Sequence, residues 1–242
     1  MSPLDLALIS VLGAVAALPQ NVAGFGFALV LAPLLVLFID PEETVIIVNI
    51  LAMLSATAVV WRLRHAVAWR TVGILFAASF VGMPFGLLVL LVVEPAVIQV
   101  LIALAVLSGT LALARGLTIG GNTAIAAAAG VAGGFLRTST SAAGPPVILY
   151  LQARSLPPDP FRATGSFFLM ATGAVAIVLY AATGSLDADI GLAVGAATPG
   201  VAIGTAAGAL FAGRVNERAF RRLVTVLLVA TAVTALVTAF LG

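Results

Sequence analysis

The chain has 242 residues, of which 62% are hydrophobic and only 8% are charged, and its mean hydropathy is +1.25. This composition excludes a soluble domain, which would carry charge at about a quarter of its positions. It also indicates membrane helices rather than a β-barrel, because the apolar runs are continuous and much longer than alternating strands.

All eleven basic residues are arginines, and they gather in short clusters at the ends of apolar segments. Such clusters are typical of membrane topology signals, so the isoelectric point near 9.9 predicts no nucleic-acid partner. Cysteine is absent and the single histidine, His65, lies among arginines. We therefore expect neither a metal site nor a cofactor.

Breaks at proline, glycine and charged residues divide the chain into ten apolar segments. A helix needs about 20 residues to cross about 30 Å of hydrocarbon. The first segment and the two segments around Arg137 are too short, which predicts a broken-helix hairpin near the start of each half. In chain order the segments are Leu4–Leu18, Val22–Ile39, Thr44–Val60, Thr71–Val93, Val97–Ala114, Thr123–Leu136, Gly144–Gln152, Ala163–Thr183, Ile190–Phe211 and Ala219–Leu241.

The second half of the chain repeats features of the first half at an offset of about 118 residues. This spacing predicts a first repeat over residues 1–114, a linker over 115–122 and a second repeat over 123–242, which together form one membrane domain. The matched features are Gly13 with Gly130, Gly26 with Gly144, Asp40-Pro41 with Asp159-Pro160, and Gly82-x-x-x-Gly86 with Gly200-x-x-x-Gly204.

Acidic and arginine-rich loops follow one another in an order that fixes a topology. Arginine loops face the cytoplasm by the positive-inside rule. Every loop obeys this rule only if the first two segments of each half form a pair that enters and leaves the membrane on the same side. Each half then consists of a hairpin plus three crossings, giving 8–10 membrane segments in two inverted repeats with both termini periplasmic.

Arg137 is the one charged residue in a long stretch that otherwise reads as membrane interior. A charge near a bilayer centre costs at least about 2.5–3.5 kcal/mol, and an anionic substrate would compensate for it. We expect the turn of the second hairpin at Arg137–Ala143, followed by a helix whose N-terminal amides point back at the turn. The candidate substrate ligands there are Arg137, Thr138, Ser139, Thr140, Ser141 and Gly144.

The counterpart of this turn in the first half is Pro19-Gln20-Asn21, where Gln20 and Asn21 can donate hydrogen bonds. We expect the two turns to face each other near the midplane and to form a single anion site. No acidic residue lies in either turn, so coupling to sodium or protons lacks an obvious carrier. Asn49, Arg162 and Thr164 are candidates for the pathway, with Arg162 fitting either a cytoplasmic anchor or a gate.

Structural interpretations of the same residues remain open. Arg137 could snorkel to the cytoplasmic interface, or it could be satisfied by carbonyls freed at the helix break. The hydroxyl residues could cap helix ends. The paired glycines predict helix packing, either within the chain or between protomers of a homo-oligomer. Trp61 and Trp69 read as interfacial anchors, and Tyr180 reads as a similar anchor at an outer end.

Several motifs resemble the sulfite exporter TauE/SafE family over essentially the whole chain. They are Gly24-Phe25-Gly26-Phe27 with Pro33, Gly130-x-x-x-Gly134-Phe135, Gly144-Pro145-Pro146 and Arg162-Ala163-Thr164. The resemblance implies a bacterial inner-membrane permease that moves sulfite, organosulfonates such as sulfoacetate, or related small anions, usually outward. The chain has Phe25 and Phe27 around Gly26 where the family commonly has Gly-Gly-Gly, and Ala143-Gly144-Pro145 where it commonly has Gly-Gly-Pro. The bulkier phenylalanines predict a narrower site.

The sequence therefore predicts a secondary transporter, in the export direction, for small sulfur-containing oxyanions. Its partners are the anionic substrate and the lipid bilayer, and its location is the bacterial inner membrane. The alternatives are an anion channel, or a permease for another small carboxylate or oxyanion. An enzyme is excluded, because a nucleophile with a base or an acidic pair is missing at membrane depth. A purely structural protein would leave Arg137 without a purpose.

Overall fold

The computed structural model describes residues 2–115 and 119–211. This part of the chain forms nine α-helices and one short 3-10 helix, and it contains no β-strand. Five of these helices are long and apolar enough to cross a membrane, which confirms the all-α membrane class. The elements are α1 (Pro3–Ala23), α2 (Phe27–Leu35), α3 (Pro41–Leu63), η1 (Arg64–Ala66), α4 (Trp69–Val92), α5 (Pro95–Ala114), α6 (Thr123–Thr140), α7 (Gly144–Ala153), α8 (Pro158–Ala182) and α9 (Ala188–Phe211). The expected segment Ala219–Leu241 lies outside the described residues.

Polar residues set the starts of several helices. Ser2 and Asp5 form a capping box at the start of α1, in which each side chain accepts a hydrogen bond from the other residue's backbone N–H. Asp40 caps α3 and Asn122 caps α6 in the simpler way, with one side-chain oxygen accepting from the first turn. These caps fix where each helix enters the apolar region.

The break of the first hairpin lies at residues 24–26, later in the chain than the sequence predicts. Helix α1 continues through Pro19, Gln20 and Asn21 to Ala23, so it is a membrane-length helix and not a short arm. Gly24 and Gly26 have φ angles of 85° and 108°, which glycine adopts at little cost. The placement of Gln20 and Asn21 in the turn was wrong, because these glycines, rather than the proline, allow the reversal.

The break of the second hairpin also comes later than predicted. Helix α6 includes Arg137 and runs to Thr140, so only Ser141–Ala143 separate it from α7. Ser139 and Thr140 are still helical, and each hydroxyl donates to the carbonyl four residues earlier, at 2.8 Å and 3.0 Å. Ser141 ends the helix with a left-handed φ of 61°.

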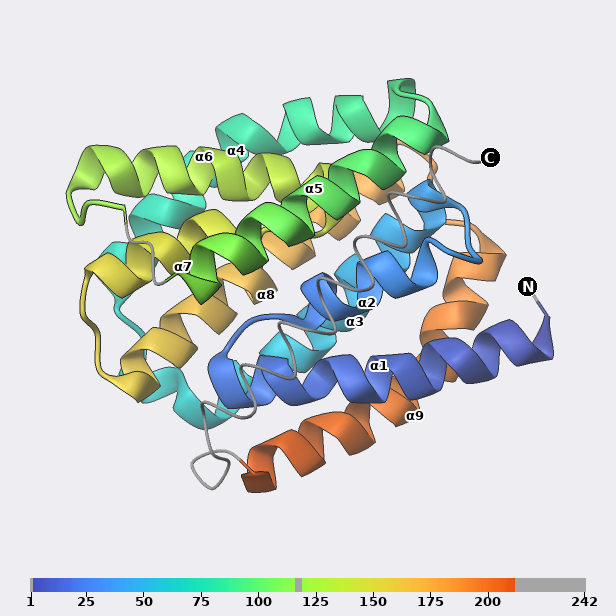
Figure 1. Cartoon of the computed structure of the whole chain (residues 1–242), viewed down its shortest axis with the longest axis horizontal. Coiled ribbons are helices and arrows are strands. Elements are labelled where there is room, and N and C mark those ends of the chain that lie inside the picture. The colour runs from blue at the N-terminus through green and yellow to red at the C-terminus, as the bar shows by residue number, and fades with distance from the viewer. Residues whose placement is uncertain (1, 116–118, 212–242) are drawn as a thin grey trace.

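The most extensive helix contacts join the two halves of the chain. Helix α4 packs on α6 and α1 packs on α9 at opposite edges of the molecule, with α3 and α8 between them (Figure 1). The two outer pairs correspond under the proposed repeat, because α1 matches α6 and α4 matches α9. In Figure 1 α1 starts at the right and α6 starts at the left, so these two helices run in opposite directions in this view. Their orientation in a membrane stays a prediction.

The paired glycines lie in these two outer contacts. A Cβ at Gly82 or Gly86 would overlap the backbone of α6, and a Cβ at Gly200 or Gly204 would overlap the backbone of α1. Such close approach is the usual role of small residues spaced by four in membrane helices. The predicted packing surfaces therefore act within the chain.

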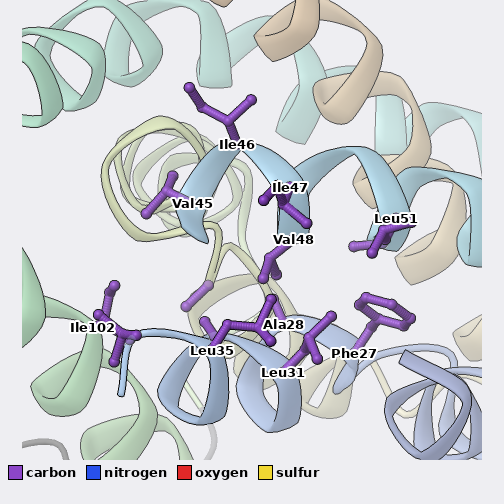
Figure 2. Packing of buried hydrophobic residues seen from close by; sticks show 14 of the residues in the cluster. Phe27, Ala28, Leu31, Leu35, Val45, Ile46, Ile47, Val48, Leu51 and Ile102 are labelled. Atoms are coloured by element: carbon purple, nitrogen blue, oxygen red, sulfur yellow. The ribbon is translucent and has the colours of Figure 1, made fainter. Parts of the chain in front are cut away.

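Helix α2 is short but almost completely buried. Eight of its nine residues are buried. Figure 2 shows Phe27, Leu31 and Leu35 of α2 lying against α3 near Val48, with Ile102 of α5 beside them. This apolar cluster holds the first hairpin against the centre of the molecule.

Candidate functional site

Arg137 is fully buried in the last turn of α6. Its Nη2 donates one long hydrogen bond, of 3.4 Å, to the backbone carbonyl of Asn49, while Nε and Nη1 have no partner. A snorkelling arginine would keep its guanidinium in water. Full burial contradicts that interpretation and leaves most of the five donors of this group unused.

The guanidinium lies at the depth of the middle of two membrane-length helices. The space above Gly173 of α8 is occupied by Nη2 of Arg137 and by Met53 of α3. Met53 is one residue, and Gly173 three residues, from the centre of its own helix, which corresponds to about 1.5 Å and 4.5 Å along the axis. The charge is therefore far from both ends of these helices.

Two of the carbonyls freed at the end of α6, those of Arg137 and Thr138, are bonded by side chains of α3 and α8. The last four carbonyls of a helix lack intrahelical partners. Asn49 Nδ2 donates to the Arg137 carbonyl at 3.1 Å, and the Tyr180 hydroxyl donates to the Thr138 carbonyl at 3.2 Å. Asn49 Nδ2 also donates to the Tyr180 hydroxyl at 3.4 Å. The freed carbonyls therefore do not satisfy the guanidinium.

Arg137 also has no carboxylate partner in the part of the chain that the structure describes. Within residues 2–115 and 119–211, the only ion pair joins Arg162 to Asp159, at 3.5 Å. A buried cation without a counter-ion is costly, because neither water nor an opposite charge stabilises it. The site as folded can accept a negative charge from outside the chain.

The four hydroxyl residues after Arg137 divide into two kinds. Thr138, Ser139 and Thr140 each donate to a backbone carbonyl of α4 or α6, so they serve the helix ends and the α4–α6 contact. Ser141 is different, because its Oγ is buried and has no hydrogen-bond partner. Of the predicted hydroxyl ligands, Ser141 alone keeps a free donor.

The structure places the two hairpin breaks side by side. Gly144 begins α7, and a Cβ built on it would lie 4.0 Å from Cβ of Phe25, in the first break. The predicted meeting of the two turns therefore takes the form of an apolar contact between Phe25 and Gly144. The polar residues of the two hairpins do not share this contact.

Gln20 and Asn21 belong to a second polar group, on α1. Gln20 Nε2 donates to the carbonyl of Gly24 at 3.1 Å, and Asn21 Nδ2 donates to Ser55 Oγ at 3.3 Å. Ser55 in turn lies 3.3 Å from Thr205 Oγ1 of α9. The single site expected from the sequence is thus divided, since none of the hydrogen bonds in the described part of the chain joins Gln20 or Asn21 to Arg137.

Arg162 fastens the first break to α8. Its Nη2 donates to the carbonyl of Asn21 at 2.6 Å, and Ser166, one turn later, donates to the carbonyl of Gly24 at 3.0 Å. The ion pair with Asp159 lies at the exposed side of this arginine. Thr164 has a different contact, because it accepts a hydrogen bond of 3.0 Å from the backbone N–H of Ala68.

A comparison with protein families identifies the class of protein to which the chain belongs. A family model described as Sulfite exporter TauE/SafE matches residues 9–235. The chain belongs to the sulfite exporter TauE/SafE family. No curated protein and no solved structure matches it. As a TauE/SafE member the chain is a membrane transporter of the sulfite-exporter type, which confirms the resemblance found in its motifs.

Two residues of the candidate site in this TauE/SafE protein were missed by sequence reasoning. Tyr180, expected at an outer interface, is fully buried and bonded to α3 and α6, so that expectation was wrong. Gly173 provides the space for the guanidinium. The spacing of three residues of this segment places them on one helix face, namely Gly173, Ala176 and Tyr180. This spacing is the feature of the sequence that could have placed Tyr180 beside Gly173. Trp61 and Trp69 are largely exposed, as expected of interfacial anchors.

Proposed function

We propose that this TauE/SafE protein exports small sulfur-containing oxyanions, such as sulfite or organosulfonates, across the bacterial inner membrane. Arg137 holds the anion at the depth of the centre of α3 and α8. Ser141 and the N–H of Gly144 at the start of α7 supply further donors, whereas Pro145 and Pro146 have no N–H. Both termini of the chain are periplasmic in this proposal.

The observation that carries the proposal is a fully buried guanidinium that has two unpartnered nitrogens and no carboxylate partner among the described residues. A bound anion removes both costs, because it supplies the missing charge and the missing acceptors. A cation or a neutral solute supplies neither. The substrate of this site is therefore negative.

The geometry of the donors favours an oxyanion. A guanidinium presents planar N–H donors that match groups carrying two or three oxygens. The buried Oγ of Ser141 and the start of α7 at Gly144 add donors in the next residues of the chain. Sulfite and the sulfonate group each carry three oxygens, enough to use the guanidinium and a hydroxyl together.

We propose that transport proceeds by alternating access between the two halves. The first hairpin is held on α8 by Arg162 and Ser166, and its break lies beside Gly144 of the second hairpin. A shift of this hairpin away from α8 would open a route from the side of the arginine-rich loops. Phe25 moves with it, since it belongs to the first break.

Export needs no coupling ion in this proposal. An anion leaving a cell with a negative interior gains about 2.3 kcal/mol per charge for each 100 mV. The carboxylates of the described residues lie at or near helix ends, as Asp40, Glu94 and Asp187 illustrate. The central region around Arg137 thus offers the anion no competing negative charge.

The test is binding to purified protein in detergent, measured by calorimetry and by thermal shift. Sulfite, sulfoacetate, isethionate, taurine, sulfate and acetate are compared on the natural chain, on Arg137→Ala and on Arg137→Lys. We expect selective stabilisation by a sulfur oxyanion that disappears in Arg137→Ala. We expect weaker binding in Arg137→Lys, which keeps the charge and loses the fork.

Binding that survives Arg137→Ala would remove this residue from the site. Selective stabilisation by acetate would indicate a carboxylate permease instead. Proteoliposome flux separates a carrier from a channel, because only a carrier shows saturation with counterflow. Inward flux driven by an imposed proton or sodium gradient would contradict export without a coupling ion.

A further inference from the structure

A positive charge and negative dipole ends lie within two residues of each other at the end of α6. The guanidinium of Arg137 is positive and largely unpaired, whereas the backbone carbonyls of Arg137 and Thr138 are negative dipole ends freed by the helix terminus. An anion at the guanidinium is attracted by the first and repelled by the second. The carbonyls must therefore be neutralised by donors if the site is to bind an anion well.

Tyr180 and Asn49 supply those donors from two other helices. Asn49 Nδ2 bonds the Arg137 carbonyl and Tyr180 OH bonds the Thr138 carbonyl, at 3.1 Å and 3.2 Å. A bond of 3.4 Å links the two side chains. Both residues are fully buried, so water does not take over this role.

The same contacts also hold the guanidinium in place. The carbonyl of Asn49 accepts the single hydrogen bond of Arg137, so the backbone of α3 contacts Nη2 while its side chain contacts the carbonyl of the same arginine. This reciprocal pair leaves Nε and Nη1 as the free donors.

We propose that Tyr180 and Asn49 are positioning residues of the anion site, which neutralise the freed carbonyls of α6 and keep the free nitrogens of Arg137 available to the substrate. The inference rests on the proposed function of Arg137. It assigns to a tyrosine of α8 and an asparagine of α3 a role in substrate affinity rather than in the stability of the fold alone.

The test compares Tyr180→Phe with Tyr150→Phe in proteoliposomes. Tyr150 is the only other tyrosine of the chain, it is also buried, and it lies on α7. Each variant is assayed for KM and kcat with a sulfur oxyanion that binds the natural protein, and for its Tm without substrate. Asn49→Leu is assayed in the same way, and Arg137→Ala is included throughout.

We expect Tyr180→Phe to raise KM about five- to tenfold, the effect of losing one buried hydrogen bond, with kcat at saturation within about twofold of the natural value. Asn49→Leu should raise KM at least as much, and Tyr150→Phe should leave it unchanged. The expected signature is a KM effect that does not follow the change in Tm.

An unchanged KM in Tyr180→Phe overturns the positioning role. A lower Tm and a lower kcat with an unchanged KM would also overturn it, because that pattern belongs to a purely structural hydrogen bond. Arg137→Ala separates the two proposals. If it abolishes binding while Tyr180→Phe has no effect, only the positioning role fails, whereas binding retained in Arg137→Ala means that the proposed site itself is wrong.

Discussion

Nη2 of Arg137 lies directly above Gly173, so close that a methyl group at position 173 would overlap it. The arginine is on α6 and the glycine is on α8, so this contact fixes where the guanidinium can sit between the helices. A side chain introduced at position 173 would therefore displace the guanidinium in the proposed anion site without removing the charge of Arg137.

Gly173→Ala should therefore displace the guanidinium and weaken anion binding by about tenfold or more, since the neighbouring Met53 leaves little room for relaxation. The measurement is calorimetric titration with a sulfur oxyanion. Gly191→Ala is the matched control, because Gly191 also lies in a helix but a Cβ there would meet nothing within 4 Å. Equal binding in both variants would mean that the guanidinium does not bind the anion.

Arg137→Met should abolish anion binding and yet raise the Tm of the ligand-free protein. Methionine fills much of the same volume with no charge to bury, and replacement of buried ionic groups by apolar ones often stabilises by about 1–4 kcal/mol. The check is a thermal melt with and without anion. A marked fall in Tm would show instead that the arginine stabilises the fold.

Gly86→Val should disrupt the contact between α4 and α6. A Cβ at Gly86 would overlap the backbone of Phe135, which cannot move aside as a flexible side chain would. We expect a loss of several kcal/mol, visible as a lower midpoint in a denaturant titration in mixed micelles. Gly73→Val lies on the same helix in open space and should cost much less.

Arg162→Gln should loosen the first hairpin. The 2.6 Å bond from Arg162 to the Asn21 carbonyl is lost, and charge-assisted bonds of this kind are worth about 1.5–3 kcal/mol. Hydrogen exchange of amides near Gly24 should become about tenfold faster or more. Asp159→Asn should have little effect, because the side chain of Asp159 is 59% exposed and such ion pairs contribute little. A larger effect of Asp159→Asn would show that the ion pair, and not the carbonyl bond, holds the hairpin.

Ser141→Cys offers a direct probe of the substrate route, because the chain contains no cysteine. We propose this position as part of the anion site because its Oγ is buried and has no partner among the described residues. We expect a negatively charged thiol reagent to label the variant in membranes, and an organosulfonate substrate to protect it. Ser155→Cys, which is exposed between α7 and α8, should be labelled without protection. Equal labelling of Ser141→Cys with and without substrate would place Ser141 outside the route.

The sequence predicted the hairpins but not the position of their breaks. Pro19 and the polar residues near it resemble a turn, yet α1 continues through them to Ala23, and Asn21 Nδ2 donates to the Ala17 carbonyl of the same helix. The reversal occurs at Gly24 and Gly26, where positive φ is inexpensive. Local composition alone does not separate these two possibilities.

The isolated charge of Arg137 in an apolar segment was readable from the sequence, whereas the contacts of Arg137 were not. A charged residue within an apolar segment can be recognised from the sequence alone. Which residue caps the freed carbonyls depends on how α3, α6 and α8 cross, and Tyr180 lies 43 positions further along the chain. An aromatic residue near the end of an apolar segment usually marks the interface, and here tertiary packing places it in the interior.

Helices of the first half pack on helices of the second half, and this has a consequence for biosynthesis. Helix α1 packs closely on α9, but α9 is synthesised last among the described helices. The first helix therefore waits in the bilayer without its glycine-lined partner during most of translation. A ribosome that stalls before Ala188 would leave this surface open to other membrane helices and to quality-control proteases.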